Sequence, residues 1–150
     1  MITIKNTQRT VKINTKYVRT VIKKILQKIG CPDFDIGIWF TTNKTIQRYN
    51  SRYRNINKPT DILSFNYHQN ISPDKHIVVK TLEDKNLGDL IISAEYVNKV
   101  ALELHKTFAN HLDTILIHGT CHLIGHTHEH TADYKKMTSR EKKLMRVSKT

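Results

Sequence analysis

The sequence predicts an α+β fold: a single domain, residues 1–150, that contains both helices and strands. Three observations predict this class. The chain has 150 residues, 38% of them hydrophobic, which is enough for one core. Segments with the two-residue period of a half-buried strand alternate with segments that have the period of an amphipathic helix. No internal repeat, low-complexity tract or linker rich in Pro, Gly or Ser divides the chain.

The first part of the chain is expected to form a strand, a helix and a second strand. Residues 2–5 alternate between isoleucine and polar residues, and this strand could continue or re-form at residues 11–13. Apolar residues between 18 and 29 recur on one face, as in a helix that ends at Gly30. Residues 34–41 alternate again and predict a strand with one buried face.

The middle of the chain contains a short helix and two more strands. Residues 43–52 have a helical pattern, and residues 55–60 form a loop because their proline excludes helix. Residues 62–67 predict a third strand and 87–92 a fourth, the latter apolar enough for a sheet interior. The pattern of residues 76–80 fits either a loop or a further strand.

Three helices are expected in the last part of the chain. Ser93 can cap the first, whose buried stripe should extend to Leu104. The second runs from about 110 to 124, and the last begins at about 131. The buried face of this last helix should contain Met137, Leu144 and Met145.

The composition excludes several classes of protein. No apolar run approaches the roughly 18 residues of a membrane helix, and the first residues lack the apolar core of a signal peptide. We therefore expect neither secretion nor membrane insertion. The two cysteines, Cys31 and Cys121, make no disulfide framework and suit a reducing cytoplasm.

The net charge of +12 is concentrated at the two ends of the chain. Residues 1–30 contain eight Lys or Arg and no acid, and residues 135–150 contain seven with one acid. This polarisation indicates a polyanionic partner, of which nucleic acid is the commonest in the cytoplasm. The alternative is that basic outer faces of helices merely keep the protein soluble.

Five of the nine histidines lie in the segment HGTCHLIGHTHEH, residues 118–130. His118 and His122 are four residues apart on a predicted helix, so both imidazoles point the same way and can share one ion. Gly125 can end the helix in a left-handed conformation and reverse the chain, which would bring His128 to the same ion. Three neutral imidazoles with an open fourth position are the ligand set of a catalytic zinc site.

Other residues of this segment are alternative ligands. In a continuous helix the Cα atom of His126 would lie ~12 Å from that of His118, too far for shared ligation. His130 could substitute for a ligand or support one, and Cys121 could bind metal but more commonly such a cysteine is buried. Chance could readily explain two histidines on a solvated helix end. It explains three histidines with an intervening glycine poorly.

The spacing H-x-x-x-H-x-x-G-x-x-H is also that of metzincin peptidases, which need a glutamate directly after the first histidine as general base. Here Gly119 occupies that position. A peptidase is therefore a minor alternative, and zinc-bound water could instead attack a phosphodiester.

With these residues in view, the chain resembles the YbeY family of bacterial rRNA maturation factors, regarded as metal-dependent endoribonucleases. Residues 118–128 are similar to the family signature H-G-x-x-H-L-x-G-x-x-H, whose three histidines bind zinc. Residues 53–65, with Tyr-Arg followed by KPTDILSF, are similar to Y-R…P-T-D-V-L-S-F. Residues 87–93, LGDLIIS, are similar to L-G-D-I-x-I-S. The order and spacing of the blocks extend the likeness over essentially the whole chain.

The resemblance implies a small mixed four-stranded sheet packed by about five helices, with a metal site in a cleft at a helix end. It implies one Zn²⁺ per chain, held by His118, His122 and His128, with Arg54 and His122 as catalytic residues. Arg54 would hold a phosphate, since its planar charged group can bind two oxygens at once. An ion pair between Arg54 and Asp61 is the alternative.

The chain departs from the family where His126 and Thr127 replace the usual Tyr-Asp before the third histidine, and the loss of that aspartate could weaken the metal site. The linker between the second and third blocks also looks long and polar. Asp61 is expected to stabilise a turn and Asp89 to pair with buried amides. Glu141 could cap a backbone, orient a ligand histidine or lie at an exposed edge.

The leading hypothesis is a zinc-dependent endoribonuclease that prefers single strands and acts in ribosomal RNA processing, at the 3′ end of 16S rRNA, and in ribosome quality control. Its partners would be rRNA, the small ribosomal subunit and ribosomal or assembly proteins. A second hypothesis is a non-catalytic ribosome-assembly factor with structural zinc. A third is a zinc hydrolase that acts on another substrate, including peptides. The sequence leaves the oligomeric state open.

Overall fold

The computed structural model describes residues 1–148 and contains a four-stranded mixed sheet. Its strands are ordered β1-β2-β4-β3; β1, β2 and β4 are parallel, and β3 is antiparallel to β4. The elements are β1 (Ile2–Asn6), α1 (Thr15–Lys28), β2 (Asp35–Thr41), α2 (Asn43–Arg54), β3 (Ile62–Asn66), the short 3₁₀ helix η1 (Leu82–Asp84), β4 (Asn86–Ser93), α3 (Ala94–Glu103), α4 (Phe108–Leu123) and α5 (Thr131–Ser148). The predicted α+β class is confirmed, with five α-helices around a four-stranded mixed sheet among the described residues.

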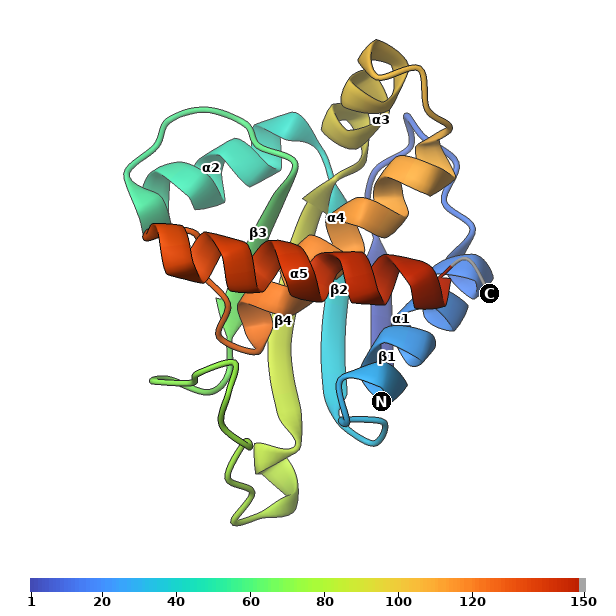
Figure 1. Ribbon diagram of the computed structural model, residues 1–150. Coiled ribbons are helices and arrows are strands. Elements are labelled where there is room, and N and C mark those ends of the chain that lie inside the picture. The colour runs from blue at the N-terminus through green and yellow to red at the C-terminus, as the bar shows by residue number, and fades with distance from the viewer. Residues whose placement is uncertain (149–150) are drawn as a thin grey trace.

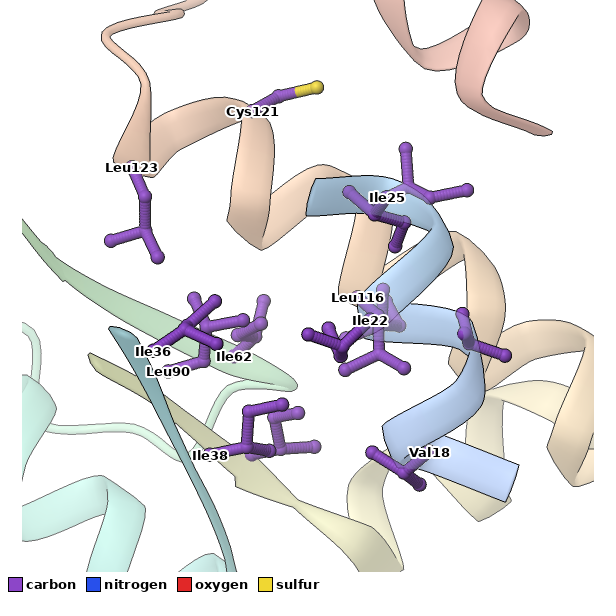
Figure 2. Packing of buried hydrophobic residues seen from close by; sticks show 14 of the residues in the cluster. Val18, Ile22, Ile25, Ile36, Ile38, Ile62, Leu90, Leu116, Cys121 and Leu123 are labelled. Carbon is purple, nitrogen blue, oxygen red and sulfur yellow. The ribbon is translucent and has the colours of Figure 1, made fainter. Parts of the chain in front are cut away.

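The main core lies between one face of the sheet and helices α1 and α4. Figure 2 shows Ile22 and Ile25 of α1 facing Leu116 of α4, with Ile36 and Leu90 of the strands beyond them. All five are at most 1% exposed. Burial of each such side chain contributes about 1.5–3 kcal/mol, so this apolar layer fixes α4 against the sheet.

Helix α5 forms an outer layer. It crosses α4 and reaches α1 (Figure 1), and it buries Met137 and Leu144 as predicted. Because α5 follows α4 after a short loop, its first half lies beside the C-terminal end of α4.

The opposite face of the sheet is covered only in part, by α2. Ile46 of α2 packs on Leu63 and Ile91 in a second, smaller cluster. Arg54 is the last residue of α2, and Asn55 then adopts a left-handed conformation with φ of 58° that ends the helix. A loop of residues 55–61 then leads from α2 to β3.

Three details differ from the sequence predictions or settle them. Residues 11–13 and 76–80 form no strand. Gln8 holds the first of these segments as a loop, because its side chain donates to Val11 O and accepts from Val11 N. Leu104 is 50% exposed, since α3 ends at the residue before it, so the prediction that it belongs to the buried stripe is wrong. Asp89 is exposed and pairs with no buried amide of the described residues, because its side chain is on the face of the sheet that α2 covers only in part.

No helix within the described residues is both long and apolar enough to cross a membrane.

Candidate metal centre

The last turns of α4 place two histidines on one face. His118 and His122 are half-buried, and their Nε2 atoms lie 3.2 Å apart. A tetrahedral zinc ion with Zn–N bonds of about 2.0–2.1 Å would space its nitrogens by about 3.3 Å. The spacing of this pair therefore fits a shared ion.

A chain reversal follows directly after α4. The amide of Gly125 donates to His122 O at 3.0 Å, and that of His126 donates to Cys121 O at 3.0 Å. These two bonds make a Schellman motif, and Gly125 has the positive φ, 100°, that this motif requires. The reversal predicted at Gly125 thus has a defined hydrogen-bonding basis.

The reversal returns His128 to the same side as the two helical histidines. Its ring centroid lies 5.3 Å from that of His122 and 6.1 Å from that of His118. One nitrogen from each ring lies within 4.8 Å of the others. His118, His122 and His128, the three-histidine group, are the three residues that the structure brings together as a potential metal site among its described residues.

Hydrogen bonds orient the two helical imidazoles. His122 donates from Nδ1 to the carbonyl oxygen of His126 at 2.9 Å, and His118 Nδ1 lies 3.0 Å from Glu141 Oε2 on α5. With protons on both Nδ1 atoms, the facing Nε2 atoms carry lone pairs and repel each other unless a cation lies between them. Partners of this kind are typical behind metal-bound histidines.

The surroundings keep His122 neutral, as a metal ligand must be. Burial lowers the pKa of His122 to about 4, and the neighbouring His118 acts in the same direction. A neutral imidazole offers its lone pair to a metal throughout the neutral pH range.

The alternative ligands lie outside the group. His126 is buried, but its ring is not part of the three-histidine group, because it occupies the second residue of the reversal. Burial raises the pKa of the Cys121 thiol to about 12, so this side chain stays a protonated core residue. His130 is exposed and also lies outside the group.

A cleft of about 410 Å³ adjoins the group. His122 and Arg54 both line it, together with Phe65 and Asn66 of β3. Asn66 donates to His122 O at 2.9 Å, which ties β3 to the last turn of α4. Arg54 is exposed, and within the described residues it makes no ion pair with Asp61.

Two other positions have structural roles. Asp61 accepts a 2.7 Å hydrogen bond from the amide of Ile62, the first residue of β3. Gly119 faces the sheet, where a Cβ atom would come within 2.5 Å of Ile62 Cδ1 and 2.9 Å of a methyl carbon of Leu90. The position that holds the general base in metzincins is therefore a packing contact here.

Sequence reasoning missed Asn66 and left the role of Glu141 open. Neither has a local signal, because both act on α4 from elements distant in the chain. Glu141 was recognisable only as a carboxylate on the inward side of the last helix.

Fold and site together define a class of protein: a small α+β protein with a candidate three-histidine metal centre at the end of a core helix. Comparison with known proteins identifies the family. The family model described as Endoribonuclease YbeY matches residues 3–149, and the chain belongs to this family.

Named relatives agree with this assignment, and a solved structure shows the same fold. A protein named Endoribonuclease YbeY from Homo sapiens is 34% identical over 142 residues, covering 95% of this chain and 84% of the relative. One of the same name from Petrotoga mobilis is 34% identical over 138 residues, covering 91% and 87%. A solution structure of a protein from Thermotoga maritima has the same fold, with a TM-score of 0.64 and 22% identity, covering 99% of this chain and 89% of that one.

Proposed function

We propose that this protein is a zinc-dependent endoribonuclease that cleaves single-stranded RNA. The observation that carries the proposal is the convergence of His118, His122 and His128, with no fourth protein ligand in the group that the described residues form. A structural zinc site closes with four protein ligands, whereas a catalytic site has three. All-imidazole ligation favours zinc over magnesium, so we assign one Zn²⁺ per chain.

The chain's own residues divide the work. His118, His122 and His128 hold the ion, and Glu141 and the His126 carbonyl keep the first two rings in the required tautomer. When bound, zinc would act as a Lewis acid and would lower the pKa of a water molecule at the open position to about 7. Arg54, which lines the same cleft as His122, holds the scissile phosphate through two parallel hydrogen bonds and balances the charge that develops on it.

The charge distribution supports RNA as the substrate. The basic residues of α1 and α5 belong to the end segments that account for the net charge of +12. Contacts between these residues and phosphates predict binding that weakens steeply as salt rises. The relatives are named as endoribonucleases, which also supports RNA as the substrate. From the family resemblance we further propose that this RNA is ribosomal RNA in the cytoplasm, at the 3′ end of 16S rRNA and in ribosome quality control, and that residues 1–150 act as a single domain.

The test compares wild type with His122→Ala and two Arg54 variants, each measured for zinc content, thermal stability and cleavage of single-stranded RNA. We expect His122→Ala to lose zinc and activity. Arg54→Ala should keep zinc but lose activity by about 10²–10³-fold, and Arg54→Lys should recover part of it. Lys99→Ala, which removes an exposed cation on α3, is the control.

Three results would overturn the proposal. Cleavage that is equal in every variant would identify a contaminating nuclease. Zinc loss that unfolds the protein, with no RNA cleavage by wild type, would favour the non-catalytic assembly factor. Cleavage of peptides instead would favour a hydrolase of another class, although Gly119 offers no general base.

A further inference from the structure

The face of the sheet that α2 covers only in part carries a further cluster of side chains, outside the three-histidine group and Arg54. Strand register places Thr3, Gly37, Asp89 and Phe65 in one row across the sheet, and Lys5 beside Trp39 in the next. Helix α2 covers only the part of this face around Ile46. A hollow of about 440 Å³ remains on the part beyond α2.

Four aromatic rings line this hollow and contact one another in sequence: Trp39, Tyr49, Tyr53 and Phe65, the aromatic platform. Trp39 and Tyr49 meet edge to face at 5.7 Å, Tyr49 and Tyr53 stack at 6.0 Å with 16° between their planes, and Tyr53 meets Phe65 at 5.3 Å. Tyr53 is 56% exposed although it belongs to this cluster. Exposed rings held by their neighbours offer flat surfaces at little cost in conformational entropy.

Cations surround the platform. Lys5 Nζ lies 4.7 Å from the centre of the Trp39 ring, and the Arg52 guanidinium lies 5.5 Å from that of Tyr53. Arg48 lines an adjoining hollow together with Trp39 and Tyr49. Helix α2 has four Lys or Arg and no acid in the sequence NKTIQRYNSRYR. This pairing of rings and positive charge complements nucleotides, whose bases stack and whose phosphates are anionic.

One acid lies among the residues that line the hollow. The Asp89 carboxylate accepts no hydrogen bond from the described residues, and it lies over Gly37, where any Cβ atom would overlap it. A carboxylate in this place repels phosphate but accepts hydrogen bonds from the N–H groups of bases. Bases, rather than the backbone, are therefore expected to face Asp89.

The platform is continuous with the proposed active site. Phe65 lines both the hollow and the cleft that contains His122. Tyr53 and Arg54 are consecutive residues at the end of α2, one contributing to each site. A strand of RNA held at Arg54 can thus extend directly onto the rings.

We propose that the aromatic platform is a base-stacking subsite for single-stranded RNA, which holds nucleotides adjacent to the cleavage site. This inference rests on the proposed function. It also supplies a physical reason for a single-strand preference, because bases paired in a duplex cannot open onto the rings.

The test uses the only tryptophan of the chain, Trp39, as its reporter. An unlabelled oligouridylate of about 12 nucleotides is titrated into the full chain in the cold, and gel analysis checks that the probe stays intact. We expect its bases to quench the tryptophan fluorescence, and an RNA duplex of equal length to leave it unchanged. Anisotropy of a labelled probe reports binding independently of quenching.

Variants of Tyr53 test the energetic contribution of the platform. Tyr53→Ala should weaken oligouridylate binding by about tenfold, and Tyr53→Phe, which keeps the ring, should bind like wild type. Tyr134→Ala is the matched control, since Tyr134 on α5 is 58% exposed against 56% for Tyr53. Thermal melting shows that each variant is folded.

The outcomes separate this inference from the proposed function. Suppose wild type cleaves single-stranded RNA, but folded Tyr53→Ala binds it equally well or binding leaves Trp39 fluorescence unchanged. The proposed base-stacking role of the platform is then wrong, and the face is free for a protein partner. Equal losses in Tyr134→Ala and Tyr53→Ala would also overturn it. If wild type neither binds nor cleaves RNA, the proposed function fails and the subsite fails with it.

Discussion

Replacement of Gly125 by alanine tests the reversal that creates the three-histidine group. Gly125 has φ of 100°, and a Cβ atom there would lie 2.8 Å from Ile71 O and 3.0 Å from Ile71 C. The left-handed conformation alone costs a non-glycine residue about 1–2 kcal/mol. Because the atoms in the way are backbone, the loop at residue 71 must also move, which we expect to cost about another 1–2 kcal/mol.

Gly30→Ala is the matched control for this perturbation. Gly30 also ends a helix with positive φ, 80°, but a Cβ atom there would have nothing within 4 Å. We expect Gly30→Ala to lower the free energy of unfolding by about 1–2 kcal/mol and Gly125→Ala by about 2–4 kcal/mol. Only Gly125→Ala should also weaken zinc binding, since His128 follows the displaced turn.

Urea unfolding of the metal-free proteins measures the free energies, and competition with a chromogenic chelator measures zinc affinity. If the two alanine variants match each other in both measurements, the turn neither presses on the loop at residue 71 nor positions His128.

Three further predictions concern single side chains. Glu141→Gln should lower zinc affinity about 10–100-fold, because an amide orients His118 less strongly than a carboxylate does. The control Glu103→Gln, at an exposed position, should leave zinc affinity unchanged. Equal affinities in the two variants would show that Glu141 does not support the metal site. The pKa of His122 is about 4 in the folded protein and 6.5 in the unfolded chain. As pH falls from 6.5 to 4 the unfolded chain therefore binds the proton first, and the metal-free protein loses stability. His122→Gln should flatten this pH dependence, measured by urea unfolding, and an unchanged slope would contradict the assignment. Burial and a hydrogen bond to a carboxylate raise the pKa of Tyr17 to about 12, so stability should fall as pH rises from 10 to 12, and an equal fall in Tyr17→Phe would refute this.

The elements of the fold could be predicted from the sequence because their patterns are local. The stripe of Ile22 and Ile25 placed α1, and the alternation of Ile36 and Ile38 placed β2, each from its own periodicity. The prediction for Leu104 was wrong because an apolar residue just after the end of a helix continues the apolar stripe in sequence but not in space. The mixed four-stranded sheet came from the family resemblance rather than from any strand alone.

The candidate site also combines features that are local in the sequence with features that are not. The spacing of His118 and His122 and the glycine at 125 are local features, so the convergence of three imidazoles could be expected from the sequence. Asp89 shows the limit of such reasoning. Side chains along its strand alternate between two faces, and only the packing of α1 and α4 shows which of these faces carries the main core.

The sequence by itself determined the helices, the strands, the basic ends and the histidine spacing, since each depends on residues a few positions apart. Tertiary structure alone decided that Glu141 meets His118, that Arg54 and His122 line the same cleft, and that Phe65 lines both this cleft and the hollow of the aromatic platform. These contacts join elements distant in the chain. Their geometry is set by how helices pack on a sheet, and no local pattern records it.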